Sequence, residues 1–345
     1  MAEVMLGPGE SLLVAARGTD AEHGLWRFVQ EAGGWTGSQL ATVGQLSSLC
    51  RHPSLPVVYG SGSVRGVVLA WRVEGTNAVP LGESLSGDDP CFLAVDPTGR
   101  LLVAINYGTS DVTLLPLAED GSLAGSFAKL KLEGSGPDAS RQEAAHPHQA
   151  IFHDGMLYVI DLGGDCILSY TVDPSQPGLA ALTEAGTVKV PPGTGPRHGV
   201  FLPDGRIAVS GELASSLVVG AASAPPGWTS VVSTHISGPA KTRSKRNYPG
   251  DIQRSEDGAF VYLANRGYDT IAAFDVRPET PRLVAEIDAT VAWPQHLLVH
   301  RGHLLIAGWD SSKVTSIALG PDGVAGKAEP LFDCPGAGWL LLYTA

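Results

Sequence analysis

Short apolar runs alternate with turn-forming residues along most of this chain. Residues 193–213 read GTGPRHGVFLPDGRIAVSGEL, where the apolar runs VFL and IAV flank the triplet PDG. A Pro-Asp-Gly triplet between two apolar runs predicts a β-hairpin. A chain that folds back through a tight turn ends its second strand at the edge where the first began. We therefore expect Arg197, His198 and Glu212 to share one edge of a sheet.

The same hairpin pattern recurs along the chain. Five clear copies begin at Pro90, Pro147, Pro196, Pro249 and Pro294. A sixth, weaker copy from Leu49 keeps the strand spacing but has a degraded turn. The turn glycines of the clear copies are spaced by 44 to 56 residues, at Gly99, Gly155, Gly205, Gly258 and Gly302. Each copy has three legible strands followed by a weaker fourth. This period predicts the blades of a β-propeller, an all-β fold.

The two ends of the chain predict how the ring closes. The N-terminal SLLVAARGTDAEHGLWRFVQ resembles the second and third strands of a blade without its first, and the C-terminal AGWLLLYTA resembles a lone strand. Joined, they form a seventh blade and remove open β edges that would promote association. We expect a seven-bladed β-propeller closed by N- and C-terminal strands that share one blade, with residues 336–345 paired to the strand around Ser11 to Ala16. No linker divides the chain, so residues 1–345 are expected to form a single domain, with loops at 133–146 and 223–248 over one face.

A propeller gathers the polar candidates of different blades on one face. The innermost strand of a blade comes first, so residues before strand one and after strand two lie close to the central channel on the same face. The Asp-Gly turns go to the opposite face, where turn geometry alone accounts for them. The residues expected around the channel are Asn106, Tyr107, His146, His148, Arg197, His198, Glu212, Asp251, Arg266, His296 and Trp309.

Four of these residues each have two interpretations. Arg197 and Arg266 either form ion pairs between blades or converge on a carboxylate or phosphate, which guanidinium forks bind well. Glu212 is either the partner of Arg197 or a carboxylate that activates water, with its pKa set by burial against arginine charge. His148 is either a strand-end histidine bonded to a neighbouring blade or a functional group.

No cofactor and no metal ion are predicted. His146-Pro-His148 is a local histidine pair, but no third or fourth ligand follows at a recognised metal-binding spacing. The sequence also lacks a GxSxG elbow, a P-loop and a dinucleotide fingerprint in a βαβ setting. Covalent serine catalysis and nucleotide chemistry therefore have no support.

Composition and charge narrow the choice of partners. The chain contains 43 glycines and 25 prolines, which suits many strands joined by tight turns, and its formal net charge of -12 argues against nucleic acid as a partner. A local basic cluster precedes the sixth blade and contains Lys241, Arg243, Lys245 and Arg246. It is either part of a solvated loop or a group of charges that steers anions toward this face. No run is long and apolar enough to span a bilayer, the N-terminus lacks a signal-peptide pattern, and the four cysteines are widely separated. These features predict a cytoplasmic protein without a membrane partner.

Six sequence elements carry a resemblance to a known family. They are AHPHQ (145–149), GTGPRH (193–198), GEL (211–213), RNYPGDI (246–252), ANRG (264–267), and WPQH followed by IAGWDSSKV. In this order, over nearly the whole chain, the sequence resembles the propeller-type lactonases, which include 6-phosphogluconolactonase and carboxy-cis,cis-muconate cyclase. The resemblance implies a seven-bladed propeller whose substrate site is lined by His148, Arg197, Glu212 and Arg266.

The chain departs from the family pattern at three positions. Gly211 stands where asparagine is usual, Gln295 where an arginine is often found, and Trp309 where glutamine is common. Loss of a third arginine weakens the implication of a phosphorylated substrate, and a tryptophan can stack on a sugar ring or an apolar ring.

The resemblance implies a hydrolase that opens an anionic sugar lactone, with 6-phosphogluconolactone as the first candidate, by metal-independent activation of water. In this interpretation Arg197 and Arg266 hold the anionic group and stabilise the oxyanion, while Glu212 or His148 activates water and protonates the leaving alkoxide. A lactonising cyclase or isomerase would use the same residues in reverse, and a non-catalytic propeller would bind a ligand or protein through this face. The remaining residues expected to contact the substrate are Tyr107, His146, His198, Asp251, His296 and Trp309.

Overall fold

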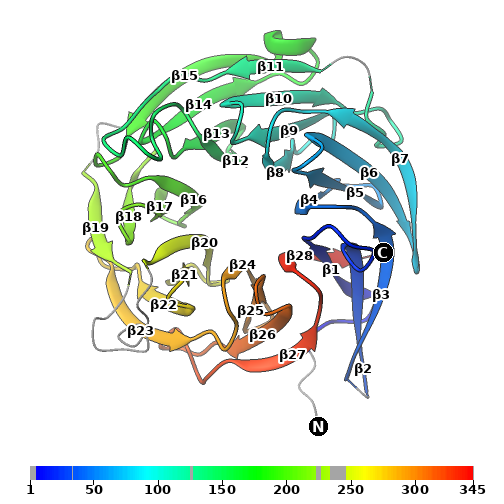
Figure 1. Ribbon diagram of the computed structural model, residues 1–345. Coiled ribbons are helices and arrows are strands. Elements are labelled where there is room, and N and C mark those ends of the chain that lie inside the picture. Colours follow the sequence, from blue (N-terminus) through cyan, green and yellow to red (C-terminus); the bar gives the residue numbers. More distant parts are fainter. Residues whose placement is uncertain (1–4, 33, 125–126, 223–226, 234–245, 345) are drawn as a thin grey trace.

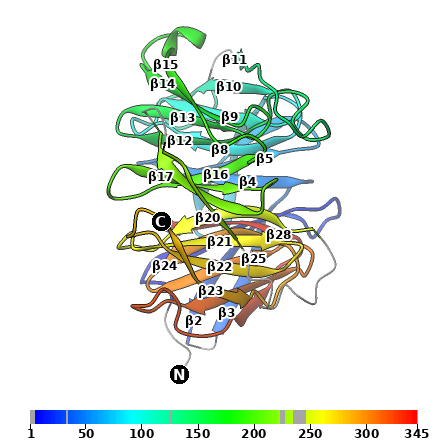
Figure 2. The same ribbon diagram turned by 90° about the vertical axis from the view of Figure 1, so that its left-hand side faces the viewer.

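The fold is a ring of β-sheets around a central channel. The computed structural model describes residues 5–32, 34–124, 127–222, 227–233 and 246–344. Within these residues the chain forms 28 strands in seven four-stranded antiparallel sheets, together with a 3-10 helix, η1 (Gly178–Ala181). The sheets surround the channel like blades (Figure 1), and a view turned by 90° shows their strands crossing the molecule between its two faces (Figure 2). The predicted all-β, seven-bladed propeller is confirmed.

Each blade extends from an innermost strand at the channel to an outermost strand at the rim (Figure 1). The closing blade consists, from the channel outward, of β28 (Ala337–Thr344), β1 (Glu10–Ala16), β2 (Gly24–Glu31) and β3 (Gly34–Thr42). The second blade consists of β4 (Leu46–Arg51), β5 (Val57–Gly62), β6 (Val67–Glu74) and β7 (Asn77–Leu85). The third consists of β8 (Pro90–Val95), β9 (Leu101–Asn106), β10 (Asp111–Pro116) and β11 (Ala128–Lys131).

The remaining blades repeat the same order from the channel to the rim. The fourth consists of β12 (Pro147–His153), β13 (Met156–Asp161), β14 (Cys166–Val172) and β15 (Leu182–Lys189). The fifth consists of β16 (Pro196–Phe201), β17 (Arg206–Gly211), β18 (Ser216–Ala221) and β19 (Thr229–Val232). The sixth consists of β20 (Tyr248–Arg254), β21 (Phe260–Arg266), β22 (Thr270–Asp275) and β23 (Arg282–Asp288). The seventh consists of β24 (Pro294–His300), β25 (His303–Gly308), β26 (Lys313–Ala318) and β27 (Glu329–Asp333).

The two ends of the chain close the ring in one blade, as predicted. β28 pairs antiparallel with β1, from Glu10 opposite Thr344 to Ala16 opposite Ala337, and lies innermost in its sheet. Leu340 of β28 packs in one buried cluster with side chains of β1 and of the seventh blade. The closure therefore combines backbone hydrogen bonds within the blade with apolar packing against its neighbour.

The core lies between the faces of adjacent blades. Inner strands such as β5 and β9 are buried at every residue, because a blade is covered on both faces by its neighbours. The outer strand β15 contains only exposed and half-buried residues. Tyr59 and Tyr262 are fully buried, and their hydroxyls donate to the carbonyls of Gly121 and Gly323 at 2.7 Å. The rings of these two tyrosines are thus buried while their hydroxyl groups keep hydrogen-bond partners.

The two predicted loops differ in outcome. Residues 133–146, all of them described, form no strand, which agrees with the predicted loop. Arg141 from this loop reaches the central pocket, which was not predicted from the sequence. The prediction for 223–248 is wrong in part, because β19 lies within this range and β20 begins at Tyr248. β19 covers the outer edge of β18, which would otherwise expose unpaired backbone groups. Residues 223–226 and 234–245, with Lys241, Arg243 and Lys245 of the predicted basic cluster, lie outside the described residues.

Helices contribute little to this fold. In the part of the chain that the structure describes, no helix has the length and apolar character needed to cross a bilayer.

Candidate active site

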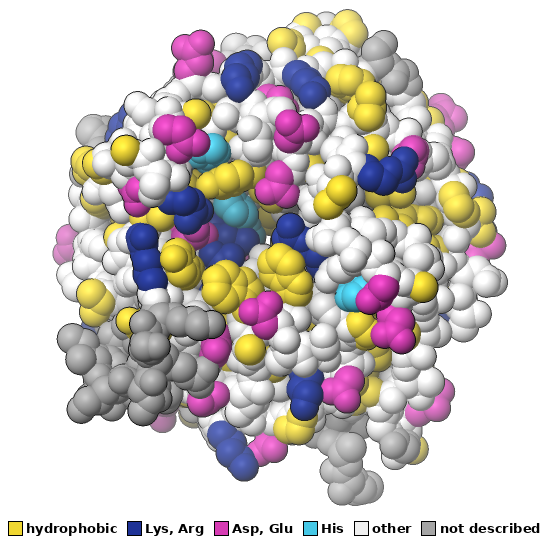
Figure 3. All heavy atoms as spheres, in the orientation of Figure 1, with side chains coloured by type: hydrophobic (Ala, Val, Ile, Leu, Met, Phe, Trp, Pro, Cys, Tyr) yellow, Lys and Arg dark blue, Asp and Glu magenta, His cyan; other side chains and the backbone are white. Residues whose placement is uncertain are grey.

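A pocket of about 490 Å³ opens at the centre of one face of the propeller. Arginine and histidine side chains gather around this central hollow (Figure 3). The volume lies in the range of sites that bind small molecules. Two sets of residues from different blades build its wall.

The first set comes from a β-bulge that recurs near the start of the innermost strand. In all seven blades this strand carries one residue more than its partner, so the register shifts. A bulge turns its extra residue out of the regular alternation of the strand. The bulges contain Ser47, Cys91, His148, Arg197, Gly250, Gln295 and Gly338, and all of these except the two glycines line the pocket.

The second set comes from the ends of the second strands. These strands run toward the pocket face, so side chains at their ends meet at the mouth of the channel. Arg266 is the last residue of β21, and the residues that directly follow β1, β9, β17 and β25 are Arg17, Tyr107, Glu212 and Trp309.

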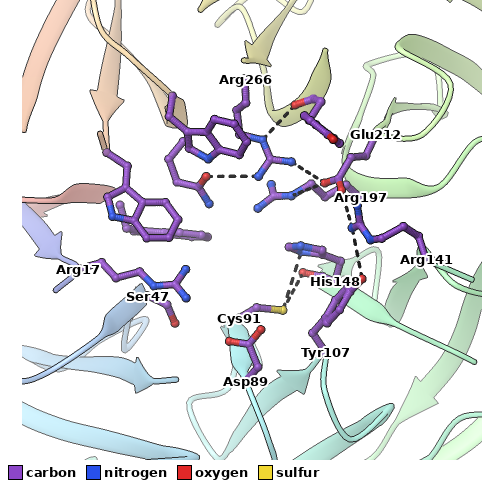
Figure 4. Close-up of a pocket in the computed structure, with 15 residues that line it drawn as sticks. Arg17, Ser47, Asp89, Cys91, Tyr107, Arg141, His148, Arg197, Glu212 and Arg266 are labelled. Atoms are coloured by element: carbon purple, nitrogen blue, oxygen red, sulfur yellow. Dashed lines mark hydrogen bonds and ion pairs between the residues drawn. The ribbon is translucent and has the colours of Figure 1, made fainter. Parts of the chain in front are cut away.

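Glu212 lies at the centre of an arginine cluster (Figure 4). Arg141 Nη2 donates to Glu212 Oε1 at 2.7 Å, and Arg266 Nη2 donates to Glu212 Oε2 at 2.5 Å. Arg197 Nε forms an ion pair with the same Oε2 at 3.3 Å. The Glu212 and Arg197 side chains are each only 5% exposed, so bulk water screens this charge cluster weakly.

Arg266 is fixed by further contacts. Its Nε donates to the Tyr248 carbonyl at 3.0 Å, and its Nη1 donates to Gln295 Oε1 at 3.3 Å. Gly250 makes room for it, because a Cβ atom at this position would lie 2.8 Å from Arg266 Nε. The bulge glycine of the sixth blade therefore allows an arginine from the neighbouring strand to occupy the space that a bulge side chain takes elsewhere.

Burial and charge set the protonation states of the cluster. Burial alone would raise the pKa of Glu212, but Arg266, Arg197 and Arg141 outweigh it, and the pKa lies below its ordinary value. Burial and repulsion from Arg266 lower the pKa of Arg197 to about 9. At neutral pH Glu212 is therefore a carboxylate and Arg197 is still charged.

His148 presents a neutral imidazole to the pocket. Burial, together with the positive charge of Arg197 and the proximity of His198, holds its pKa well below the ordinary value. Its Nδ1 lies 3.8 Å from Cys91 Sγ. Burial raises the pKa of Cys91 to about 12, so this sulfur is a thiol and a poor nucleophile at neutral pH.

His146 lies behind Tyr107 rather than in the pocket. The two rings stack with centroids 4.4 Å apart, and His146 Nδ1 lies 3.1 Å from the Tyr107 carbonyl oxygen. The Tyr107 hydroxyl accepts a hydrogen bond from Arg141 Nη2 at 3.3 Å. His146 therefore supports Tyr107 and, through it, Arg141.

His198, Asp251 and His296 form a buried network behind the pocket wall. His198 Nδ1 lies 2.8 Å from Asp251 Oδ1, and His296 Nε2 lies 3.6 Å from Asp251 Oδ2. The backbone N–H of Leu297 also donates to Oδ2, at 2.8 Å. The network connects the innermost strands of three consecutive blades, and the His198 ring packs edge-on against His148 with centroids 5.1 Å apart.

Aromatic rings form another part of the wall. Trp293, Trp309 and Trp339 all line the pocket. The Arg17 guanidinium carbon lies 4.3 Å from the centroid of the Trp309 ring, and that of Arg266 lies 5.5 Å from the centroid of the Trp293 ring. Such contacts hold a guanidinium group in place while leaving its edge free to donate.

Comparison with known proteins assigns the chain to a family. A family model described as a seven-bladed β-propeller lactonase matches residues 24–338. The chain belongs to the seven-bladed β-propeller lactonase family. The resemblance inferred from the sequence motifs is thereby confirmed.

Individual members and structures of similar fold agree with this assignment. The chain is 32% identical over 216 residues to a 6-phosphogluconolactonase of Bacillus subtilis, a match that covers 61% of this chain and 60% of that protein. It is 28% identical over 274 residues to a 6-phosphogluconolactonase of Klebsiella pneumoniae, covering 78% and 79% of the two chains. The chain spans 60 to 64% of the length of several curated relatives that it matches.

Among solved structures, a protein from Lactobacillus plantarum has a TM-score of 0.85 at 23% identity, covering 97% of this chain and 99% of that chain. The periplasmic gluconolactonase of Pseudomonas aeruginosa has a TM-score of 0.81 at 21% identity, covering 96% and 98%. These two similarities show that the chain shares its fold with both proteins.

The predicted site residues fall into two groups, according to whether they line the pocket. One group lines the pocket as expected: Tyr107, His148, Arg197, Glu212, Arg266 and Trp309. The other group is buried behind it: Asn106, His146, His198, Asp251 and His296. None of His146, His198, Asp251 and His296 lines the pocket, contrary to the expectation that they surround the channel. The bulge sends His198, Asp251 and His296 into the wall, whereas His146 precedes β12 and lies behind Tyr107. Their contact with a substrate stays a prediction.

Sequence reasoning missed two arginines of the lactonase-family pocket. Arg17 follows the second strand of the closing blade, the same position that Glu212 has in its blade, so the rule used elsewhere would have found it. Arg141 lies in an irregular loop without a repeat position. With Arg197 and Arg266 they bring the number of lining arginines to four, which offsets the arginine that Gln295 replaces.

The metal prediction stays untested by this geometry. Within the described ranges, no group of three or more His, Cys, Asp or Glu residues is arranged to hold a metal ion. Chelation, as set out below, is the test of metal independence.

Proposed function

We propose that this protein is a lactonase that hydrolyses an anionic sugar lactone, with 6-phosphogluconolactone as the leading substrate and without a metal ion. Membership of the lactonase family and the names of several relatives support the reaction class. In this reaction the oxygen of water bonds to the acyl carbon, the bond between that carbon and the ring oxygen breaks, and the ring oxygen takes a proton. The product is an open hydroxy acid.

The observation that carries the proposal is the local charge of the pocket. Four arginines and two carboxylates line it, which leaves two positive charges in excess, whereas the whole chain carries a formal net charge of -12. A positive, partly buried pocket in an acidic protein favours an anionic ligand over the bulk of the surface. Sugar lactones with a phosphate or carboxylate have the required charge.

The arginine cluster is suited to stabilise the oxyanion. Negative charge develops on the carbonyl oxygen when water adds, and preorganised donors aimed at that oxygen lower the barrier. Arg266 is fixed by Glu212 and the Tyr248 carbonyl, so it does not need to reorganise during the reaction. We assign the carbonyl end of the lactone to Arg197 and Arg266.

His148 is the general base in this proposal. Its imidazole is neutral at neutral pH and faces the pocket, so it can take a proton from water and return it to the ring oxygen. Both oxygens of Glu212 already accept hydrogen bonds from arginines, so neither is free to take a proton from water. Glu212 therefore acts as a positioning residue for the arginines.

Turnover of a lactone panel by the purified protein tests the proposal. The panel contains 6-phosphogluconolactone and unphosphorylated gluconolactone, with spontaneous hydrolysis subtracted and the protein treated with a chelator beforehand. We expect turnover that survives chelation and a fall in kcat of about a hundredfold or more in His148→Ala. His153→Ala is the matched control, because His153 lies at the other end of the same strand and contacts Phe201 instead of the pocket.

Rates no higher than spontaneous hydrolysis for every lactone would contradict the proposed activity. Loss of activity on chelation, with recovery on addition of a divalent ion, would contradict metal independence alone.

A cytoplasmic location is also part of the proposal. All four cysteines are unpaired thiols, which suits a reducing compartment. Cell fractionation tests this location, since one structure of similar fold is a periplasmic gluconolactonase.

A further inference from the structure

Arg17 stands apart from the other arginines of the pocket. It follows β1 in the closing blade and lies on the opposite side of the pocket from Glu212 and Arg141 (Figure 4). Its Nε donates to Gln45 Oε1 at 3.0 Å, and its guanidinium group lies over the Trp309 ring. One edge and one face of the guanidinium are therefore occupied, and its orientation is fixed.

The charge of Arg17 is not neutralised by an ion pair. Among the described residues no carboxylate lies within 4.0 Å of its nitrogens, although Asp89 lines the same pocket. Arg141, Arg197 and Arg266, in contrast, all form ion pairs with Glu212. Arg17 is thus the lining guanidinium whose charge is most available to a ligand.

The pocket consequently has two cationic ends separated by an aromatic wall. One end is the arginine cluster around Glu212, and the other is Arg17 on Trp309. A ligand with a single anionic or polarised group would use only one of them. A ligand with two such groups at opposite ends of a sugar-sized body would use both, within a cavity of about 490 Å³.

We propose that Arg17 determines specificity by binding a second anionic group of the substrate, at the end remote from the lactone carbonyl. This inference rests on the proposed function, in which the carbonyl end lies against Arg197 and Arg266. The remote group is a phosphate or a carboxylate, because both match the planar donor fork of a guanidinium group.

The test compares the discrimination between charged and neutral lactones in variants of Arg17. The ratio of kcat/KM for 6-phosphogluconolactone to kcat/KM for gluconolactone is measured in the wild type, Arg17→Ala and Arg17→Lys. A charge-assisted hydrogen bond accounts for a ten- to hundredfold effect, so the ratio should fall by about that factor in Arg17→Ala. Arg17→Lys keeps the charge without the fork and should retain part of the ratio.

A matched control removes a similar arginine outside the pocket. Arg277 also lies over an aromatic ring, Phe260, at 5.0 Å, but it pairs with Asp275 and does not line the pocket. Arg277→Ala should leave the ratio unchanged. A third lactone that carries a remote carboxylate distinguishes phosphate binding from carboxylate binding. The ratio of its kcat/KM to that of gluconolactone falls in Arg17→Ala only if Arg17 binds carboxylates as well.

Calorimetric binding of 6-phosphogluconate and gluconate separates failure of this inference from failure of the proposed function. If no lactone is turned over, but 6-phosphogluconate binds ten- to hundredfold more weakly to Arg17→Ala than to the wild type, the proposed activity is wrong and the role of Arg17 stands. An unchanged ratio and unchanged binding in a variant with a wild-type melting temperature would overturn the role of Arg17.

Discussion

Glu212 holds together three arginines that would otherwise repel one another. Its two carboxylate oxygens accept hydrogen bonds from Arg141 and Arg266, and one of them forms an ion pair with Arg197. The Glu212 side chain is almost fully buried. A single residue thus sets the positions of three arginines that line the pocket. In the proposed reaction Glu212 acts through geometry, because small displacements of donors from the reacting atoms have large effects on rate.

Glu212→Gln should lower kcat by about a hundredfold with a smaller change in KM, because the amide can accept from only one side and no longer balances the arginine charge. Steady-state kinetics over a range of pH would measure it. If Glu212 only positions the arginines, the shape of the pH profile should stay that of the wild type. Glu83→Gln is the control, since Glu83 pairs with Arg65 at the exposed surface, where ion pairs contribute little. A kcat close to that of the wild type in the folded Glu212→Gln protein would exclude this role.

Gly250→Ala should displace Arg266 without changing any charge. The added methyl group would lie 2.8 Å from Arg266 Nε and 2.9 Å from its Cδ, so the side chain must move away from Glu212 and the Tyr248 carbonyl. We expect kcat/KM for a lactone to fall by roughly tenfold or more. Gly326→Ala provides the comparison, because a Cβ at position 326 meets no atom within 4 Å. Equal activity in the two variants would show that the position of Arg266 does not matter.

At the scale of elements, the bulge in the innermost strand is the device that builds the site. It supplies one pocket-lining side chain in five of the blades and directs the following residue into the wall between blades. In the fifth, sixth and seventh blades the residues directed into the wall are His198, Asp251 and His296. Their network connects three innermost strands that share no backbone hydrogen bonds.

This network should make the stability of the propeller depend on pH. Burial, followed by the charge of Arg197, lowers the pKa of His198 to about 4, and burial also lowers the pKa values of His148 and His296. Below pH of about 6.5 the unfolded chain binds protons that the folded chain does not, so the free energy of unfolding should fall as the pH decreases toward 4. Each such histidine contributes a slope of up to about 1.4 kcal/mol per pH unit.

Urea unfolding at several pH values between 7.5 and 4.5 measures this slope. His198→Phe keeps an aromatic ring against His148 and removes one titrating group, so its slope should be smaller by about 1.4 kcal/mol per pH unit. A free energy of unfolding that is constant across this range in the wild type would be incompatible with neutral buried histidines.

At the scale of the whole molecule, the ring depends on a strand that comes last in the chain. β28 is the innermost strand of the closing blade, and its side chains pack against both the second and the seventh blade. Without it β1 would present an unpaired edge at the channel, and the ring would be open between those two blades.

Deletion of residues 336–345 should therefore give an aggregating protein, detectable by light scattering and by loss of a cooperative melting transition. Thr344→Ala is the control, because it retains every backbone hydrogen bond of β28 and alters only an exposed side chain. A soluble truncated protein with an unchanged melting temperature would show that the shared blade is not needed for closure.

Local patterns in the sequence were sufficient to predict the architecture of this protein and part of its candidate site. Apolar runs, Asp-Gly turns and the repeat predicted the blades and the shared closing blade, because these features act through local hydrogen bonding and periodic burial. The same repeat identified Tyr107, Glu212, Arg266 and Trp309, since strand ends have a defined position in every blade.

The choice of which of two adjacent residues faces the pocket depends on the folded sheet. Arg197 lines it and His198 does not, because the bulge shifts the alternation by one residue, and the bulge is defined by the pairing of this strand with the second strand of the blade. Arg141 reaches the pocket from an irregular loop whose path is set by contacts such as that with Glu212. Arg17 reaches the same pocket from near the start of the chain because ring closure brings the first strand beside the last. The predicted closing blade together with the strand-end rule would have placed Arg17 there, although Arg17 was not among the predicted site residues.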